Sequence, residues 1–129
     1  MIDFSKCPCI YWSDSTKISY IQRRIIVYSI MYYENNESCV PDSYYDSLSH
    51  QLVQLQKDAG FDEFRKSTYY YAMYDFDGST GFDIPSRLTK YDREYLGNIA
   101  AHVYKQWKSG TTFKERKEKL SNDKTKRLK

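Results

Sequence analysis

The chain has 129 residues and a mass of 15.4 kDa, which is enough for one domain around one hydrophobic core. Hydrophobic residues make up 40% and charged residues 29%, a balance that excludes an intrinsically disordered chain. No apolar run approaches the ~20 residues that span a bilayer, and the N-terminus lacks the basic start and apolar stretch of a signal peptide. We therefore expect a cytoplasmic protein with no membrane partner.

The net charge of +3 comes from the C-terminal end of the chain. Residues 114–129 hold eight Lys or Arg and three acidic residues, whereas the rest of the chain holds twelve basic and fourteen acidic residues. We predict a single domain over residues 1–110 and a basic, flexible tail over residues 111–129. Such a tail is either a solvated chain end or a contact for the phosphates of a nucleic acid.

The chain offers a poor set of metal ligands. Its cysteines are Cys7, Cys9 and Cys39, and its histidines are His50 and His102. An odd number of cysteines is a poor disulfide framework, and a structural zinc site needs four ligands. We expect reduced cysteines and no bound metal.

Two helices are predicted in the first half of the chain. Isoleucine and tyrosine side chains recur every three or four residues at positions 18, 21, 25, 28 and 32, which predicts a helix over residues 15–35. Further apolar residues at positions 26, 30 and 33 indicate that this helix is buried on two sides. A second helix is predicted over residues 42–59, with Asp42 as its N-cap and Gly60 as its stop.

The middle of the chain has the composition of a β-hairpin. Residues 67–76 are rich in aromatic side chains, which favour strands, and Asp77-Gly78 is a typical hairpin turn. Residues 80–84 are predicted to return as a short second strand. A third helix is predicted over residues 89–108, with its inner face at positions 88, 91, 95, 99, 103 and 107. Three helices and one small antiparallel hairpin make an α+β domain.

The predicted hairpin supplies a candidate partner-binding face. Tyr69 and Tyr71 would point to the same side of the first strand, and Asp75 and Asp77 would lie at its end. Tyrosine is enriched among the residues that dominate protein–protein binding. These four residues are therefore the predicted contacts for a protein partner.

Two tyrosines and two aspartates converge where the first helix ends and the second begins. Tyr32 closes the first helix, and Asp42, Tyr45 and Asp46 lie at the start of the second. Two aromatic faces and two carboxylates suit a flat, cationic ring that carries a ribose, because the rings attract the cation and the carboxylates bind hydroxyls. The alternative is structural: the two tyrosines pack together, Asp42 caps the helix, and Asp46 interacts with the helix dipole.

At this motif, residues 21–60 resemble the small N-terminal subdomain of bacterial NAD⁺-dependent DNA ligases. That subdomain has a helix that ends in a tyrosine, a loop with Pro-Asp, and Tyr-Asp at the opening of the next helix. Tyr32 and Asp42 match the first two features, and Tyr45 and Asp46 match the third. The resemblance implies that the tyrosines stack near nicotinamide and that the aspartates face the ribose or the ring. Tyr33 stands where the family usually has histidine.

The rest of the chain lacks the other parts of a ligase. It has no adenylation lysine motif and no room for an oligonucleotide-binding barrel or a helix-hairpin-helix module, so we expect no enzyme activity. Small orphan proteins similar to this ligase segment occur in phages and mobile elements.

Two hypotheses follow from the resemblance. In the first, the chain is a non-catalytic phage or mobile-element protein, in the cytoplasm of a bacterial host, that binds NMN or NAD⁺ through Tyr32, Tyr33, Asp42, Tyr45 and Asp46. This hypothesis requires the four residues Tyr32, Asp42, Tyr45 and Asp46 to be partly exposed around one cleft. In the alternative, the nucleotide site is vestigial and the chain inhibits a host defence system, as anti-CRISPR proteins do. The alternative expects Tyr32 and Tyr45 to be buried against each other.

Overall fold

The structure is a computed structural model that describes residues 2–5, 9–78 and 83–110. Its elements, in chain order, are a short 3-10 helix η1 (Cys9–Tyr11) and the α-helices α1 (Asp14–Asn35), α2 (Asp42–Ala59), α3 (Phe61–Phe64), α4 (Tyr70–Met73), α5 (Ile84–Arg87) and α6 (Lys90–Lys108). Within this part of the chain, no helix is long and apolar enough to cross a membrane. The predicted basic tail lies outside the described residues.

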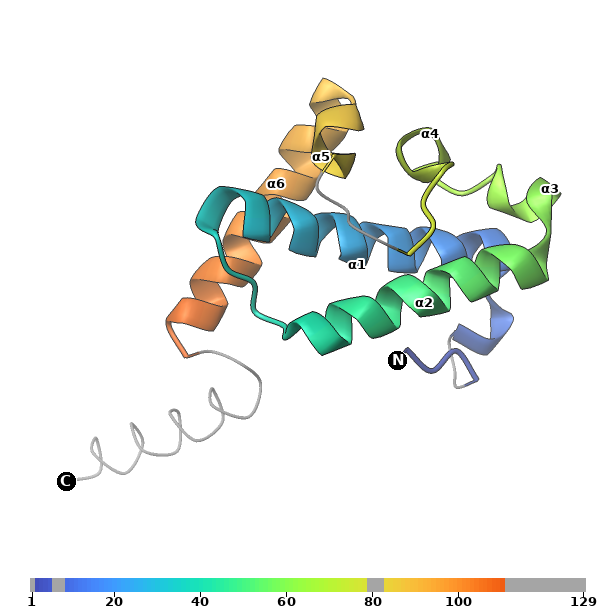
Figure 1. Ribbon diagram of the computed structural model, residues 1–129, viewed down its shortest axis with the longest axis horizontal. Coiled ribbons are helices and arrows are strands. Elements are labelled where there is room, and N and C mark those ends of the chain that lie inside the picture. The colour runs from blue at the N-terminus through green and yellow to red at the C-terminus, as the bar shows by residue number, and fades with distance from the viewer. Residues whose placement is uncertain (1, 6–8, 79–82, 111–129) are drawn as a thin grey trace.

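The helix α1 is the central element of the fold. Figure 1 shows α2 running antiparallel beside it and α6 crossing its C-terminal half. Besides these two helices, α1 contacts the short helices α3 and α5, and α5 also contacts α4. The two longest helices after α1 therefore cover it from different sides, and the short helices close what remains.

Burial on several sides explains why α1 forms. Its fully buried side chains are Ile18, Ile21, Gln22, Ile25, Ile26, Ile30 and Met31. These positions step around the helix by about 100° per residue, so they cover more than one face. Isoleucine is only a moderate helix former, so α1 is stabilised by tertiary burial more than by local propensity. This confirms the prediction of a first helix that is buried on two sides.

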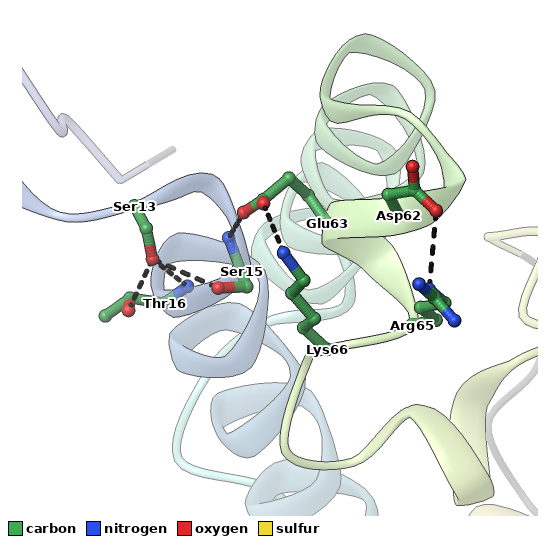
Figure 2. Close-up of polar contacts among 7 residues, drawn as sticks. All are labelled: Ser13, Ser15, Thr16, Asp62, Glu63, Arg65 and Lys66. Carbon is green, nitrogen blue, oxygen red and sulfur yellow. Dashed lines mark hydrogen bonds and ion pairs between the residues drawn. The ribbon is translucent and has the colours of Figure 1, made fainter.

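Polar side chains define the start of α1. Ser13 is the N-cap, and its hydroxyl accepts a hydrogen bond from the backbone N–H of Thr16. Glu63 of α3 accepts a bond from the N–H of Ser15 at 3.3 Å and pairs with Lys66, as Figure 2 shows. The Lys66 ammonium lowers the pKa of the Glu63 carboxyl, and an anion is favourable at a helix N-terminus. Glu63 therefore ties α3 to the first turn of α1.

The start and end of α2 match the predicted residues, but Asp42 has a different role. The N-cap of α2 is Pro41, and Asp42 is the first helical residue, with no side-chain capping bond at this end. The prediction of Asp42 as a cap is therefore wrong. Gly60 ends α2 with a φ of 84°, a left-handed conformation that favours glycine, as predicted.

The predicted α+β class is wrong. The described residues contain no strand, and the segment expected to be the first strand carries α4. The reason lies in Gln22 of α1, whose side chain is fully buried. Its carbonyl oxygen accepts the N–H of Tyr69 at 3.2 Å, and its amide donates to the hydroxyl of Ser67 at 3.0 Å. A long-range bond to α1 therefore takes the place of a hairpin ladder, and strand preference depends on such context.

The predicted return strand falls largely on residues that the structure does not describe. Of its described residues, Asp83 precedes α5 and Ile84 opens that helix. Ile84 and Pro85 are buried, so this segment joins the core as a helical turn.

The third predicted helix is present, and only part of its predicted face packs against the core. Thr89 caps α6 by accepting the N–H of Asp92. The buried residues of α6 are Leu96 and Ala100, and Leu88, Ile99 and Val103 of the predicted face are partly buried beside them, whereas Tyr91 and Tyr95 of that face are 75% and 45% exposed. The small Ala100 side chain lets α6 lie close to α1, and the bulky tyrosines turn outward.

We predict that Gln22→Met lowers the free energy of unfolding by about 1–3 kcal/mol, because the buried N–H of Tyr69 loses its acceptor. Urea unfolding measures the change. Gln56→Met is the matched control, since Gln56 is also buried but its amide nitrogen has no hydrogen-bond partner among the described residues. The control should be as stable as the wild type or more stable. Equal losses in the two variants would contradict the role given to Gln22.

Candidate functional site

A contact between α1 and α2 holds Tyr45, one of the five predicted nucleotide-site residues, in place. Its hydroxyl lies 2.9 Å from the hydroxyl of Ser29 on α1, which is a hydrogen-bond distance. Burial raises the pKa of the Tyr45 phenol above its ordinary value, the Ser29 bond opposes this rise, and the nearby Asp46 carboxylate adds to it. Tyr45 is therefore a half-buried, anchored ring with Asp46 close to its polar end.

Tyr32 lies on α1 close to Ser29, the residue that holds the Tyr45 hydroxyl. It comes three residues after Ser29, and residues at this spacing are neighbours on a helix surface. Its side chain is 44% exposed. The end of α1 is held by Asn36, whose N–H donates to the carbonyl oxygen of Tyr32 at 2.8 Å with Asn36 at a φ of 58°. Tyr32 therefore presents part of its ring to solvent from a fixed backbone position.

The two aspartates share one side of α2. Asp42 and Asp46 are four residues apart, so they lie one above the other on the helix, and both are exposed. Neither has a salt bridge or hydrogen bond with another side chain in the described part of the chain. Their carboxylates are exposed to solvent, and Asp46 is close enough to Tyr45 to act on its phenol electrostatically.

Tyr33 lies beside Tyr32 at the end of α1. It is about 100° from Tyr32 around the helix axis and four residues from Ser29, a spacing at which helix residues are also neighbours. It is 65% exposed. All five predicted site residues therefore lie at the same end of the antiparallel α1–α2 pair, and Tyr33 is the more exposed of the two α1 tyrosines.

The four predicted partner-binding residues do not form one face. Tyr69 is buried, and Tyr71 is partly exposed, with its hydroxyl bonded to the carboxylate of Asp92. Asp75 is held by both nitrogens of Arg87, at 2.5 and 3.2 Å. Asp77 lies in the exposed turn before Gly78. The strand that was expected to align these residues is absent from the described part of the chain, so their side chains are dispersed.

Asp75 has a structural role instead. Arg87 contacts Asp83 at 2.8 Å as well as Asp75, and its guanidinium lies 5.7 Å from the ring centroid of Tyr74. Hydrogen bonding to Arg87 holds the pKa of the Asp75 carboxyl below its usual value. Arg87 thus joins the end of α4 to α5.

A contact that the sequence does not predict holds the loop between α1 and α2. The hydroxyl of Tyr104 donates to Glu37 at 2.5 Å, and the Lys108 ammonium lies 2.6 Å from the same carboxylate oxygen. Lys108 also lies 4.8 Å from the ring centroid of Trp107. These contacts tie the loop to the end of α6. Because 67 residues separate Tyr104 from Glu37, no local sequence signal reveals the pair.

Metal ligands do not cluster in the described residues. No group of three or more His, Cys, Asp or Glu side chains in this part of the chain is placed to hold a metal ion. Cys9 and Cys39 are free thiols, and burial raises the pKa of Cys39. The groups that the α1–α2 junction offers to a ligand are therefore its tyrosine rings and its carboxylates.

We predict that Glu37 stabilises the fold at neutral pH and that this contribution fades in acid. The Lys108 hydrogen bond lowers the pKa of Glu37 below its ordinary 4.5. A carboxyl with a lowered pKa in the folded state stabilises above its unfolded pKa and loses this effect as the pH falls through the folded pKa. Glu37→Gln should therefore be less stable than the wild type at pH 7, and the difference should shrink below pH 4.5.

Urea unfolding of both proteins across this pH range measures the difference. Glu94→Gln is the control, because Glu94 is exposed on α6 and has no salt bridge within the described residues. A stability difference for Glu37→Gln that stays constant from pH 7 to acid would contradict the proposed loop contact.

Comparison with known proteins identifies no relative of this chain. No protein-family model, no curated protein and no solved structure matches this chain. The likeness of residues 21–60 to a ligase subdomain therefore depends on the residue pattern itself, and the function is argued from the chemistry of the site.

Proposed function

We propose that the chain binds the nicotinamide mononucleotide group, as NMN or within NAD⁺, at the junction of α1 and α2, and that it does not catalyse a reaction. The observation that carries this proposal is the arrangement of four side chains. The exposed Tyr32 lies near the anchored Tyr45, and Asp42 and Asp46 are open on the adjoining turns of α2.

The chemistry of these side chains suits a nicotinamide nucleotide. The nicotinamide ring is flat and carries a positive charge, so the electron-rich face of Tyr32 attracts it. Tyr45 is already held by Ser29, so little side-chain freedom is lost when a ligand packs on its ring. Asp42 and Asp46 supply only acceptor atoms, which match the hydroxyl donors of a ribose and the positive ring.

The partial exposure of the site favours this hypothesis over a purely structural role. If Tyr32 and Tyr45 only packed together, Tyr32 would be buried, yet 44% of its surface is accessible. The ligase-like spacing of the same residues points to the same ligand. We place the chain, on this basis, among the non-catalytic accessory proteins of phages or mobile elements that act in a bacterial cytoplasm.

A second candidate function is binding to a host protein, as an inhibitor of a defence system. It is favoured by the exposed rings of Tyr91 and Tyr95 on α6, which lie 6.4 Å apart between centroids with only 7° between their planes. Exposed tyrosines are common anchors in protein–protein interfaces. This surface differs from the hairpin face predicted from the sequence, since Tyr69 is buried and Asp75 is paired.

We predict that NMN and NAD⁺ bind to the wild type and that the double variant Tyr32→Ala, Asp46→Ala weakens binding at least about tenfold. The variant loses a cation–π contact and a charged hydrogen-bond acceptor. Isothermal titration calorimetry gives both affinities. Tyr91→Ala, Glu94→Ala is the matched control, because it removes one exposed tyrosine and one exposed carboxylate from α6.

The control should bind like the wild type. Circular dichroism establishes that each variant is folded. The absence of heat from a folded wild type at millimolar nucleotide would reject the proposal. Equal affinities of the site variant and its control would reject it as well.

A further inference from the structure

A cluster of three aromatic rings joins the N-terminal segment to the first half of α1. The ring centroids of Phe4, Trp12 and Tyr20 lie 5.4–6.2 Å apart, in tilted or edge-on contact. The segment before η1 is fixed to α2 by Gln51, whose side chain makes hydrogen bonds of 3.0 and 2.7 Å with the N–H and the carbonyl oxygen of Ile2. The rings are therefore held in place from two sides of the fold.

Three cations of α1 surround this ring cluster. The Lys17 ammonium lies 5.9 Å from the centroid of Phe4, and the guanidinium carbons of Arg23 and Arg24 lie 5.7 and 5.5 Å from the centroid of Tyr20. Arg24 is also within 3.5 Å of the hydroxyl of Tyr44. We call Lys17, Arg23 and Arg24 the cationic face. They lie within eight residues, and the seven steps from Lys17 to Arg24 correspond to about 10 Å along the helix.

The charges of the cationic face are not neutralised by the described part of the protein. Five other cations are paired with carboxylates, namely Arg65, Lys66, Arg87, Arg93 and Lys108, and Lys57, Lys90 and Lys105, which are unpaired within the described ranges, are spread over α2 and α6. Lys17, Arg23 and Arg24 have no carboxylate within salt-bridge distance among the described residues. Outside residues 114–129 the chain has more acidic than basic residues, so three unpaired cations on one face are a local feature and not a general excess of charge.

An exposed aromatic ring lies next in the chain to the ring cluster. Tyr11, the residue before Trp12, is 83% exposed, and its ring makes no stacking, cation–π or side-chain hydrogen-bond contact with the described part of the chain. A ring of this kind can stack with a nucleobase, because every base has a π face. An acidic peptide would satisfy the three cations, but it would gain nothing specific from Tyr11.

We propose that the cationic face and Tyr11 bind single-stranded nucleic acid. Lys17, Arg23 and Arg24 contact successive phosphates, with the two guanidiniums pre-oriented by Tyr20, and Tyr11 stacks with a base. A single strand is the form that suits this surface, since its bases are accessible for stacking while its backbone meets the cations. This surface runs from the start of α1 to its middle, where Arg24 reaches the Tyr44 hydroxyl in the first turn of α2, and it uses none of the residues proposed for the nucleotide.

The test compares two full-length variants that lose the same charge. Lys17→Gln, Arg23→Gln, Arg24→Gln removes the cationic face, and Lys57→Gln, Lys90→Gln, Lys105→Gln removes three exposed cations of α2 and α6 that also have no salt bridge among the described residues. Both keep residues 111–129, so any binding by this basic segment is common to the two. Fluorescence anisotropy with a labelled 20-nucleotide oligothymidine at 50 and 200 mM salt gives the affinities.

We expect the first variant to bind at least tenfold more weakly than the wild type at 50 mM salt. The slope of log affinity against log salt should become shallower by about 2, because each phosphate contact on a single strand contributes about 0.7. The control should change affinity by less than about twofold. Tyr11→Ala, which affects an exposed ring and leaves the core intact, should weaken binding at least about fivefold without changing the slope.

Three results would overturn the proposal. The first is equal binding by the two charge variants, which would assign any affinity to the rest of the chain. The second is wild-type affinity in Tyr11→Ala, with circular dichroism showing that all variants are folded. The third is tighter binding to an oligoglutamate of the same length than to the oligonucleotide, which would make an acidic protein segment the ligand.

Discussion

The isoleucines of α1 face in several directions, so this helix would expose apolar side chains to water unless other helices covered it. Ile18, Ile21, Ile25, Ile26 and Ile30 are all fully buried. Their burial requires cover from α2 on one side and α6 on another, and α3 and α5 complete the enclosure. Apolar burial is the dominant favourable term in folding, so the positions of the other helices follow from the need to cover α1.

This constraint also decides where the protein has chemistry to offer. The isoleucine faces of α1 are covered by other helices, so polar function is left to the side chains that escape this cover. At the C-terminal end, Tyr32 emerges beside the α2 start, and Glu37 fixes the connecting loop to α6. Farther back along α1, Arg23 and Arg24 lie over a ring that packs against the N-terminal segment. The two proposed binding surfaces thus use different residues on the same central helix.

The sequence predicted those parts of the fold that depend on local periodicity and failed where a distant partner decides. The limits of α2 and the cap of α6 at Thr89 follow from neighbours in the chain. The prediction of a hairpin was wrong because Gln22, more than 40 residues away, accepts a hydrogen bond from the backbone N–H of Tyr69 and supports a helical turn there. For the candidate site, the residue pattern placed Tyr32 and the α2 aspartates at one junction. It gave no sign of Glu37, whose partners become neighbours only in the folded chain.

The central claim is that the α1–α2 junction holds a nicotinamide nucleotide, and the most direct measurement is an NMR titration of ¹⁵N-labelled protein with NMN. The account predicts saturable shifts of the backbone amides around Tyr32 and from Asp42 to Asp46, with amides at the N-terminal end of α1 unchanged. Saturable shifts confined to another part of the chain, or an unchanged spectrum at millimolar NMN, would contradict the account.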